Sequence, residues 1–243
     1  MKTKVNILWL WNDAMNRNGS QGNVLALSRR LEWRGISCEI KTLPVGEKPD
    51  LSDGDILYIG GGLPYDNADL LASLAENAQA LRDYVNSGRV LLAVCEGFEL
   101  LGKSITLADG RALPGAAVGP YTTVYGEKRV AGNVIFEYQK SSVVCFENHA
   151  GQIYLEEGAD PLGKVSYGQG NNTRDDGFGL RHRNFFGAPA YGLLPNNPAM
   201  ADAVLLAVMR REDPKARLEP LNDSFETLAH DVLCARIRQE GKI

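Results

Sequence analysis

The chemistry of this sequence centres on Cys95, which directly follows five apolar residues, Val90 to Val94. The stretch from 88 to 102 reads GRVLLAVCEGFELLG, so the cysteine separates a strand-like run from a second apolar segment. A cysteine at a strand-to-helix turn, with Gly97 two positions later, has the arrangement of a nucleophile elbow, which lifts the side chain above the edge of a sheet. We expect the N–H groups of the new helix to lower the thiol pKa and favour the thiolate. The open alternative is a small buried cysteine that only ends a strand.

A glycine-rich loop is the second candidate element. The segment YIGGGLPYD contains Gly60 to Gly62 directly after an apolar run. Consecutive glycines let the backbone approach a ligand and point N–H groups into the crevice at the carboxyl end of a strand, as an oxyanion hole requires. A tight turn would use the same glycines, but open α/β sheets bind ligands at this edge.

Composition excludes several classes of function. The net charge of −4 provides no basic surface for nucleic acid. Four scattered cysteines without a C-x-x-C pair, together with three histidines, argue against a disulfide scaffold and a metal site, and we expect no cofactor. No run of about 18 apolar residues suggests a transmembrane segment, and no signal-peptide pattern opens the chain, so we expect a soluble, cytoplasmic protein.

The elements that must position these groups follow an α/β pattern, with a mostly parallel central sheet flanked by helices. Strands are expected at VNILWL, CEIKTL, DILYIG and RVLLAV, the last apolar on both faces and therefore central. Helical spacing predicts one helix after Ser20, which is a plausible cap, closing on Gly35, and another from Leu70 to Val85 that ends at Gly88.

The second half of the chain is expected to be rich in β-structure. From about 113 to 186 the pattern becomes short, glycine-punctuated pieces: TTVYG, VIFEY, SVVCF, QIYL and NFFGA. Helical spacing returns in NPAMADAVLLAVMRR and in a last helix from about 223 to 238. Without repeats or a low-complexity linker, residues 1–243 are expected to form a single domain.

Several of these motifs together resemble one protein family. The chain is similar over nearly its full length to the class I (triad) glutamine amidotransferases, in the GatD-like branch related to cobyric acid synthase. The segments that carry the resemblance are NGSQGNVLALSRRLEWRGI, GGGLPYDN, LLAVCEGFELLG, EKRVAGNVIFEY, CFENHAGQIYL, GNNTRDDG, FFGAPAYGLLPNNPAMAD and PLND. The resemblance implies a flavodoxin-like fold and glutamine hydrolysis that supplies ammonia to a MurT-like ligase partner, for amidation of a peptidoglycan precursor, lipid II.

The resemblance assigns roles to particular residues. Cys95 becomes the nucleophile, backbone N–H groups near Gly62 and Glu96 the oxyanion hole, and Arg129 a substrate-binding residue whose guanidinium suits an α-carboxylate. The alternative for Arg129 is a solvated surface position. Tyr191, in FFGAPAYGLLPNNP, stands where the family has its histidine base. A phenol with a pKa of about 10 does not replace imidazole as a base for a thiol at neutral pH.

None of the three histidines offers an evident substitute for this base. His182 precedes Tyr191 by nine residues and is expected at the far end of a strand, roughly 20 Å or more away. His149 lies in a segment shared with the family, which favours a structural or partner-facing role. His230 falls in the terminal helix, where a surface position is expected.

We expect no ATP-binding site in this chain. No G-x-G-x-x-G follows the first strand, and the one G-x-x-x-x-G-K-[ST] match, GFELLGKS at 97–104, lies inside the segment that follows Cys95, so ammonia made here would be used by a separate ligase subunit, forming a heterodimer. Two alternatives stay open. One is a catalytically impaired amidotransferase-like subunit that binds or regulates a partner, and the other is a cysteine nucleophile acting on a different amide or ester.

Overall fold

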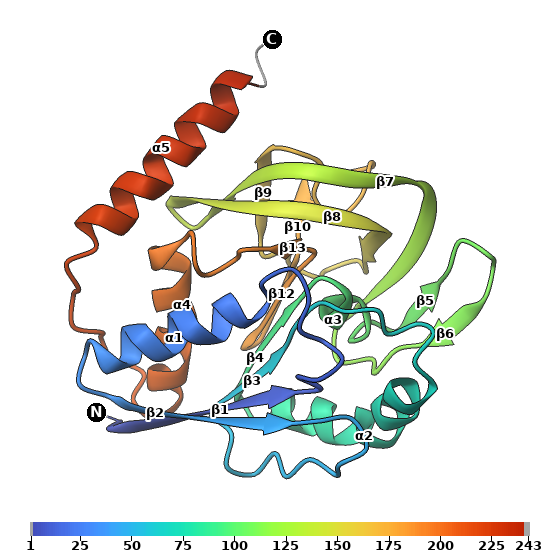
Figure 1. The fold of residues 1–243 in the computed structure, drawn as a ribbon, viewed down its shortest axis with the longest axis horizontal. Helices are drawn as coiled ribbons and strands as arrows, with labels where there is room; N and C mark the ends of the chain where they lie inside the picture. Colours follow the sequence, from blue (N-terminus) through green and yellow to red (C-terminus); the bar gives the residue numbers. More distant parts are fainter. Residues whose placement is uncertain (1, 241–243) are drawn as a thin grey trace.

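A six-stranded sheet lies at the centre of the protein, and the computed structural model describes residues 2–240 of the chain (Figure 1). The strand order is β11-β12-β4-β3-β1-β2, and every neighbouring pair is parallel except β11 with β12. The strands are β1 (Lys4–Leu10), β2 (Ser37–Leu43), β3 (Ile56–Ile59), β4 (Val90–Val94), β11 (Leu180–His182) and β12 (Phe185–Ala188). The mostly parallel sheet and the internal position of β4 are as expected.

Helices cover both faces of this sheet. The helices α1 (Gln21–Glu32) and α4 (Pro198–Glu212) lie side by side on one face, and α2 (Ala68–Asn86) covers the other (Figure 1). Alternate residues of β4 divide between two apolar clusters, Val90 and Leu92 packing toward α1 and α4, Leu91 and Ala93 toward α2. Because both faces are covered, every residue of β4 is buried.

Both predicted helices end near the glycines that were expected to close them. Gly35 and Gly88 have φ of +69° and +81°, a left-handed conformation that glycine adopts freely after a helix. Ser20 is the N-cap residue of α1, as expected, but its side chain makes no capping hydrogen bond. Its Oγ instead accepts the N–H of Gly61 at 3.0 Å, which ties the start of α1 to the glycine loop.

The β-rich part forms a second sheet, built on two strands that are longer than expected. The predicted pieces TTVYG and VIFEY are one strand, β7 (Tyr121–Tyr138), and SVVCF and QIYL are joined in β8 (Ser141–Leu155). The two strands pair antiparallel along most of their length, with a register shift between Tyr125 and Val130. The remaining elements of this region are β5 (Ser104–Thr106), β6 (Ala112–Pro114), β9 (Gly163–Tyr167), β10 (Gly177–Phe178) and β13 (Ala190–Tyr191).

One predicted β piece belongs to the other sheet. The NFFGA segment forms β12, which pairs parallel to β4 with Ala188 opposite Val94. The chain then crosses at Pro189 into β13, whose Tyr191 pairs with Phe146 of β8. The segment from β12 to β13 therefore joins the two sheets beside the end of β4.

The last helix, α5 (Ser224–Glu240), extends away from the body (Figure 1). Its Cys234 and Ile237 pack on Ile135 and Val144 of the second sheet. None of the helices within residues 2–240 has the length and apolar character needed to cross a membrane.

A buried arginine connects α1 to the segment that leads into α5. The Arg30 guanidinium forms ion pairs with Asp202 of α4 and with Asp223, each at 2.7 Å. Hydrogen bonds to both carboxylates raise the pKa of Arg30 further, against the opposing effect of burial, so it stays charged.

Candidate active site

Cys95 lies at the strand-to-helix turn where the sequence places it. Its backbone has φ of 53° and ψ of −130°, an unfavourable region for any residue other than glycine, between β4 and the short helix α3 (Glu96–Glu99). The N–H of Cys95 donates to the carbonyl of Ala188 at 2.8 Å, and its own carbonyl accepts the N–H of Phe98 at 2.9 Å. Hydrogen bonds on both sides thus hold this strained turn against the end of β12.

The glycine loop packs directly against this turn. A Cβ atom on Gly61 would lie 3.0 Å from Cβ of Cys95, 3.0 Å from Oε2 of Glu96 and 2.9 Å from Cε1 of Tyr191. A Cβ on Gly97 would lie only 2.4 Å from the carbonyl oxygen of Gly60. The loop and the turn approach closely only because glycine occupies these positions.

The two amides expected to form an oxyanion hole face the same negatively charged group. The N–H of Gly62 donates to Oε2 of Glu96 at 3.1 Å, and the backbone N–H of Glu96 hydrogen-bonds the same carboxylate. Both amides therefore interact with one carboxylate beside Cys95. That carboxylate is the protein's own Glu96 side chain, a contact that the sequence did not suggest.

Tyr191 reaches this carboxylate from the second sheet. Its hydroxyl donates to Oε2 of Glu96 at 3.4 Å, and its ring lies beside Gly61. Burial raises the pKa of the phenol, and the nearby charges of Cys95 and Glu96 add to this increase. Tyr191 stays neutral and serves as a hydrogen-bond donor.

The expectation of a lowered thiol pKa is wrong. Burial raises the pKa of Cys95 well above its ordinary value, and the charge of Glu96 raises it further, while hydrogen bonding by the Tyr191 hydroxyl opposes both effects. The side chain is only 4% exposed. Because α3 has four residues, its N-terminus supplies too small a dipole to offset these effects. The resting cysteine is a neutral thiol.

A second carboxylate, Glu99, lies one helical turn further on and was also missed by sequence reasoning. It accepts hydrogen bonds from the hydroxyls of Tyr65 and Tyr125, the latter at 2.9 Å. Burial raises the pKa of Glu99 to about 6, although the two hydroxyls oppose the shift. The signal in the sequence was a pair of acidic residues, at 96 and 99, directly after the cysteine on one helical turn.

Arg129 lies on an exposed part of β7, within the irregular stretch between Tyr125 and Val130. Its Nη1 donates to the carbonyl of Asn148 at 3.4 Å, and its charge lowers the pKa of Glu96. Arg129 therefore acts on Glu96 from the second sheet through its charge, and its role toward a substrate carboxylate stays a prediction.

None of the three histidines is a hydrogen-bond partner of Cys95. His182 pairs with Phe185, which is opposite Leu91, so it lies at the far end of the sheet from Cys95, as expected. His149 is buried, with Nδ1 2.8 Å from the carbonyl of Gly151 and Nε2 3.6 Å from Glu147, which favours the structural role over a partner-facing one. His230 is half-buried, not fully on the surface, with Nδ1 3.0 Å from the carbonyl of Asn196.

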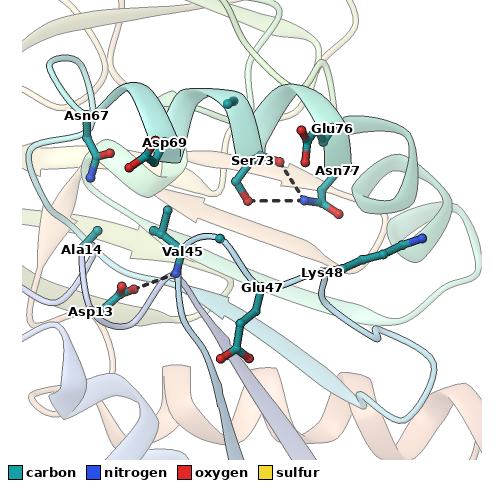
Figure 2. Close-up of a pocket in the computed structure, with 12 residues that line it drawn as sticks. Asp13, Ala14, Val45, Glu47, Lys48, Asn67, Asp69, Ser73, Glu76 and Asn77 are labelled. Carbon is teal, nitrogen blue, oxygen red and sulfur yellow. Dashed lines mark hydrogen bonds between the residues drawn. The ribbon is translucent and has the colours of Figure 1, made fainter.

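A cavity of about 880 Å³ opens between the loops after β1 and β2 and the start of α2 (Figure 2). Asp13 accepts the N–H of Val45 on one side, and Ser73 and Asn77 hydrogen-bond each other on the other side (Figure 2). Cys95 is not among its lining residues, although Ala14 lies directly behind Gly62. The cavity is therefore a neighbour of the thiol turn and not part of it.

Within residues 2–240, no three side chains among His, Cys, Asp and Glu are grouped in a way that could hold a metal ion.

Comparisons with known proteins match this arrangement to one family. Residues 6–199 match the CobB/CobQ-like glutamine amidotransferase domain. Subunit GatD of the lipid II isoglutaminyl synthase (glutamine-hydrolyzing) of Streptococcus pneumoniae is 29% identical over 213 residues, which cover 86% of this chain and 82% of that protein. The GatD subunit of Staphylococcus aureus is 28% identical over 241 residues, 98% of each chain.

Solved structures share the fold. A crystal structure of a glutamine amidotransferase superposes with a TM-score of 0.59 at 16% identity, covering 83% of this chain and 98% of that one. The glutaminase domain of Trypanosoma brucei CTPS with bound acivicin gives a TM-score of 0.55 at 14% identity, covering 89% and 96%. These likenesses confirm the expected α/β fold of the class I amidotransferases.

Proposed function

The chain belongs to the CobB/CobQ-like glutamine amidotransferase family, as its motifs indicated, and we propose that it is the glutamine-hydrolysing subunit of an amidating ligase complex. One observation carries the proposal. The N–H groups of Gly62 and Glu96 both interact with the Glu96 carboxylate, beside a cysteine held at a strand-to-helix turn. A pair of amides that binds a carboxylate has the polarity to bind a tetrahedral oxyanion.

In the proposed reaction, glutamine binds at the carboxyl edge of β4 with its α-carboxylate toward Arg129. The sulfur of Cys95 attacks the side-chain amide carbon, and the C–N bond breaks to release ammonia and leave a glutamyl thioester. Water then attacks the thioester carbon, which releases glutamate and restores the thiol.

The ammonia is used by a partner. The G-x-x-x-x-G-K-S match at 97–104 runs from α3 into β5, whereas a phosphate-binding loop leads from a strand into a helix. The two GatD relatives are named as subunits of lipid II isoglutaminyl synthase. We place this chain in a heterodimer with a MurT-like ATP-dependent ligase that converts the D-glutamate of lipid II to D-isoglutamine. The proposal assigns the complex to the cytoplasm, where ATP is available.

The test of this function is covalent labelling with 6-diazo-5-oxo-norleucine, a glutamine analogue, on the complex of the full chain with its ligase subunit. We expect the label on Cys95 by peptide mass spectrometry, and glutamate release that Cys95→Ser abolishes. Cys38→Ser is the matched control, because Cys38 is a half-buried thiol on β2, at the edge of the same sheet. Glutamate release that survives Cys95→Ser, or a folded complex without labelling, would refute the proposal.

A second candidate function is favoured by one specific observation. The carboxylate of Glu96 occupies both oxyanion donors, and Tyr191 stands where the resemblance expects a histidine. A catalytically impaired subunit that binds its ligase partner without hydrolysing glutamine would show complex formation that is unaffected by Cys95→Ala, with glutamate release at background level.

A further inference from the structure

Glutamine hydrolysis by Cys95 requires a group that takes the thiol proton, and none of the hydrogen bonds of the three histidines reaches Cys95. The Tyr191 ring, Oε2 of Glu96 and Cβ of Cys95 all lie beside Gly61. The Tyr191 hydroxyl donates to Oε2 of Glu96 at 3.4 Å, and its hydrogen bonding also lowers the pKa of the Cys95 thiol. Tyr191 thus interacts with both the thiol and a buried carboxylate.

We propose that Glu96 is the proton acceptor for Cys95, and that the proton moves through the Tyr191 hydroxyl. For its substrate the inference rests on the function proposed above. A carboxylate reached through one intervening hydroxyl satisfies the geometric requirement for general-base catalysis, in which a single water or hydroxyl can connect the two groups.

The step is balanced without any further reactant. The thiol S–H bond breaks as its proton passes to the Tyr191 oxygen, while the phenolic proton moves to Oε2 of Glu96. The sulfur electron pair forms the bond to the amide carbon. When the C–N bond breaks, the same proton returns through Tyr191 to the departing nitrogen, which leaves as ammonia, and Glu96 is a carboxylate again.

Proton transfer to Glu96 would also free the oxyanion donors. In the resting state the charged carboxylate accepts the N–H groups of Gly62 and Glu96. Hydrogen bonds to an ionised acceptor are roughly twice as strong as those to a neutral one. A neutral Glu96 therefore holds these amides less tightly, at the moment when the substrate oxygen gains negative charge.

The surroundings of Glu96 suit an acceptor of this kind. Burial raises the pKa of the carboxyl, and the amides, the Tyr191 hydroxyl and Arg129 moderate the increase. A higher pKa makes a carboxylate a stronger base. The titratable and charged groups that act on it come from α3, the preceding turn, β7 and β13, and they are Cys95, Glu99, Tyr125, Arg129 and Tyr191.

The first test measures the alkylation rate of Cys95 by iodoacetamide against pH, on the full chain, with peptide mass spectrometry. With Glu96 as acceptor, the rate reaches a plateau between the pKa of Glu96 and that of Cys95. Glu96→Gln should remove the plateau, so that the rate rises tenfold per pH unit, and Tyr191→Phe should do the same while keeping the ring. Glu99→Gln, on the same helical turn, is the matched control and should keep the plateau.

The alternative is that Glu96 acts on Cys95 only through its charge, so that removing this charge lowers the pKa of the thiol. Glu96→Gln would then be alkylated faster than the parent protein at neutral pH, and the parent protein would show no plateau. That outcome would overturn the proposal. The alkylation test does not involve glutamine. A plateau in a protein that releases no glutamate would therefore support Glu96 as the proton acceptor and refute glutamine as the substrate.

The second test uses glutamate release by the complex. Glu96→Gln should lower the rate by about a hundredfold, the lower end of the effect of a general base. The same substitution should cost less than tenfold in a Tyr191→His background, because imidazole takes the thiol proton without Glu96. An equal loss in both backgrounds would show that Glu96 only supports the fold.

Discussion

Glu96 and Glu99 lie three residues apart on α3, and their surroundings differ in kind. Glu96 is held by backbone amides and by Tyr191, beside the thiol. Glu99 is enclosed by the hydroxyls of Tyr65 and Tyr125 and is 1% exposed. The first carboxylate shares its partners with a nucleophile, whereas the second is held by two half-buried tyrosines.

Two carboxylates on one helical turn thus meet different partners, and only Glu96 is beside the thiol. Side chains at i and i+3 of a helix share a face, so both carboxylates point toward the second sheet. Glu96 meets the glycine loop, where backbone N–H groups are free to bind an anion. Glu99 meets tyrosines, whose neutral hydroxyls only partly oppose burial, so that its pKa rises to about 6. Their roles are therefore set by the partners that the fold supplies.

The largest expected effect on glutamate release comes from replacing Tyr191, which interacts with both Glu96 and the thiol. Tyr191→His places an imidazole beside both Cys95 and Glu96, and its pKa near neutrality suits it to accept the thiol proton directly. We expect glutamate release by the complex to increase at least about a hundredfold. Steady-state kinetics with glutamine would measure this gain. An unchanged rate, with the variant folded, would mean that the glutamine site is defective beyond its base.

The close approach of loop and turn provides the next prediction. Gly61→Ala adds a Cβ within 3.0 Å of Cys95, Glu96 and Tyr191, so these groups must separate. Overpacking of this kind costs about 1–3 kcal/mol, and the plateau in Cys95 alkylation should be lost. Urea unfolding and alkylation would measure the two effects.

Gly132 offers the matched control for that substitution. A Cβ on Gly132 would meet no atom within 4 Å, and its backbone does not adopt positive φ. Gly132→Ala should therefore leave both stability and alkylation close to those of the parent protein. Equal behaviour of the two alanine variants would show that the contacts around Gly61 do not hold the cluster together.

The central sheet could be predicted from the sequence because its signals are local. The buried run from Val90 to Val94 ends abruptly at Cys95, and Gly88 marks the end of the preceding helix. Each of these features depends on a few neighbouring residues. Periodicity and helix-ending glycines are sufficient to locate such elements.

The second sheet and the acidic cluster could not be predicted in the same way. Gly126, at the end of TTVYG, suggested a break within β7, but the strand continues past it and pairs with β8 again from Val130. Glu96 depends on Gly62 and Tyr191, which lie 34 and 95 residues away along the chain. Which partner meets a carboxylate is decided by packing between sheets, and residue spacing carries no information about that.

The smallest effect concerns Glu99 and the pH dependence of stability. Because the native protein raises the pKa of this carboxyl from 4.5 to about 6, the folded state binds the proton more tightly than the unfolded chain. The stabilisation is complete below the unfolded value and is lost as pH rises through about 6, a change of about 2 kcal/mol. Glu99→Gln cannot ionise and should lack this loss. Urea unfolding at several pH values should show the variant gaining about 2 kcal/mol on the parent between pH 4.5 and pH 7. A difference that stays constant over this range would mean that Glu99 is not held in an environment that disfavours its charge, and the contrast with Glu96 would then fail.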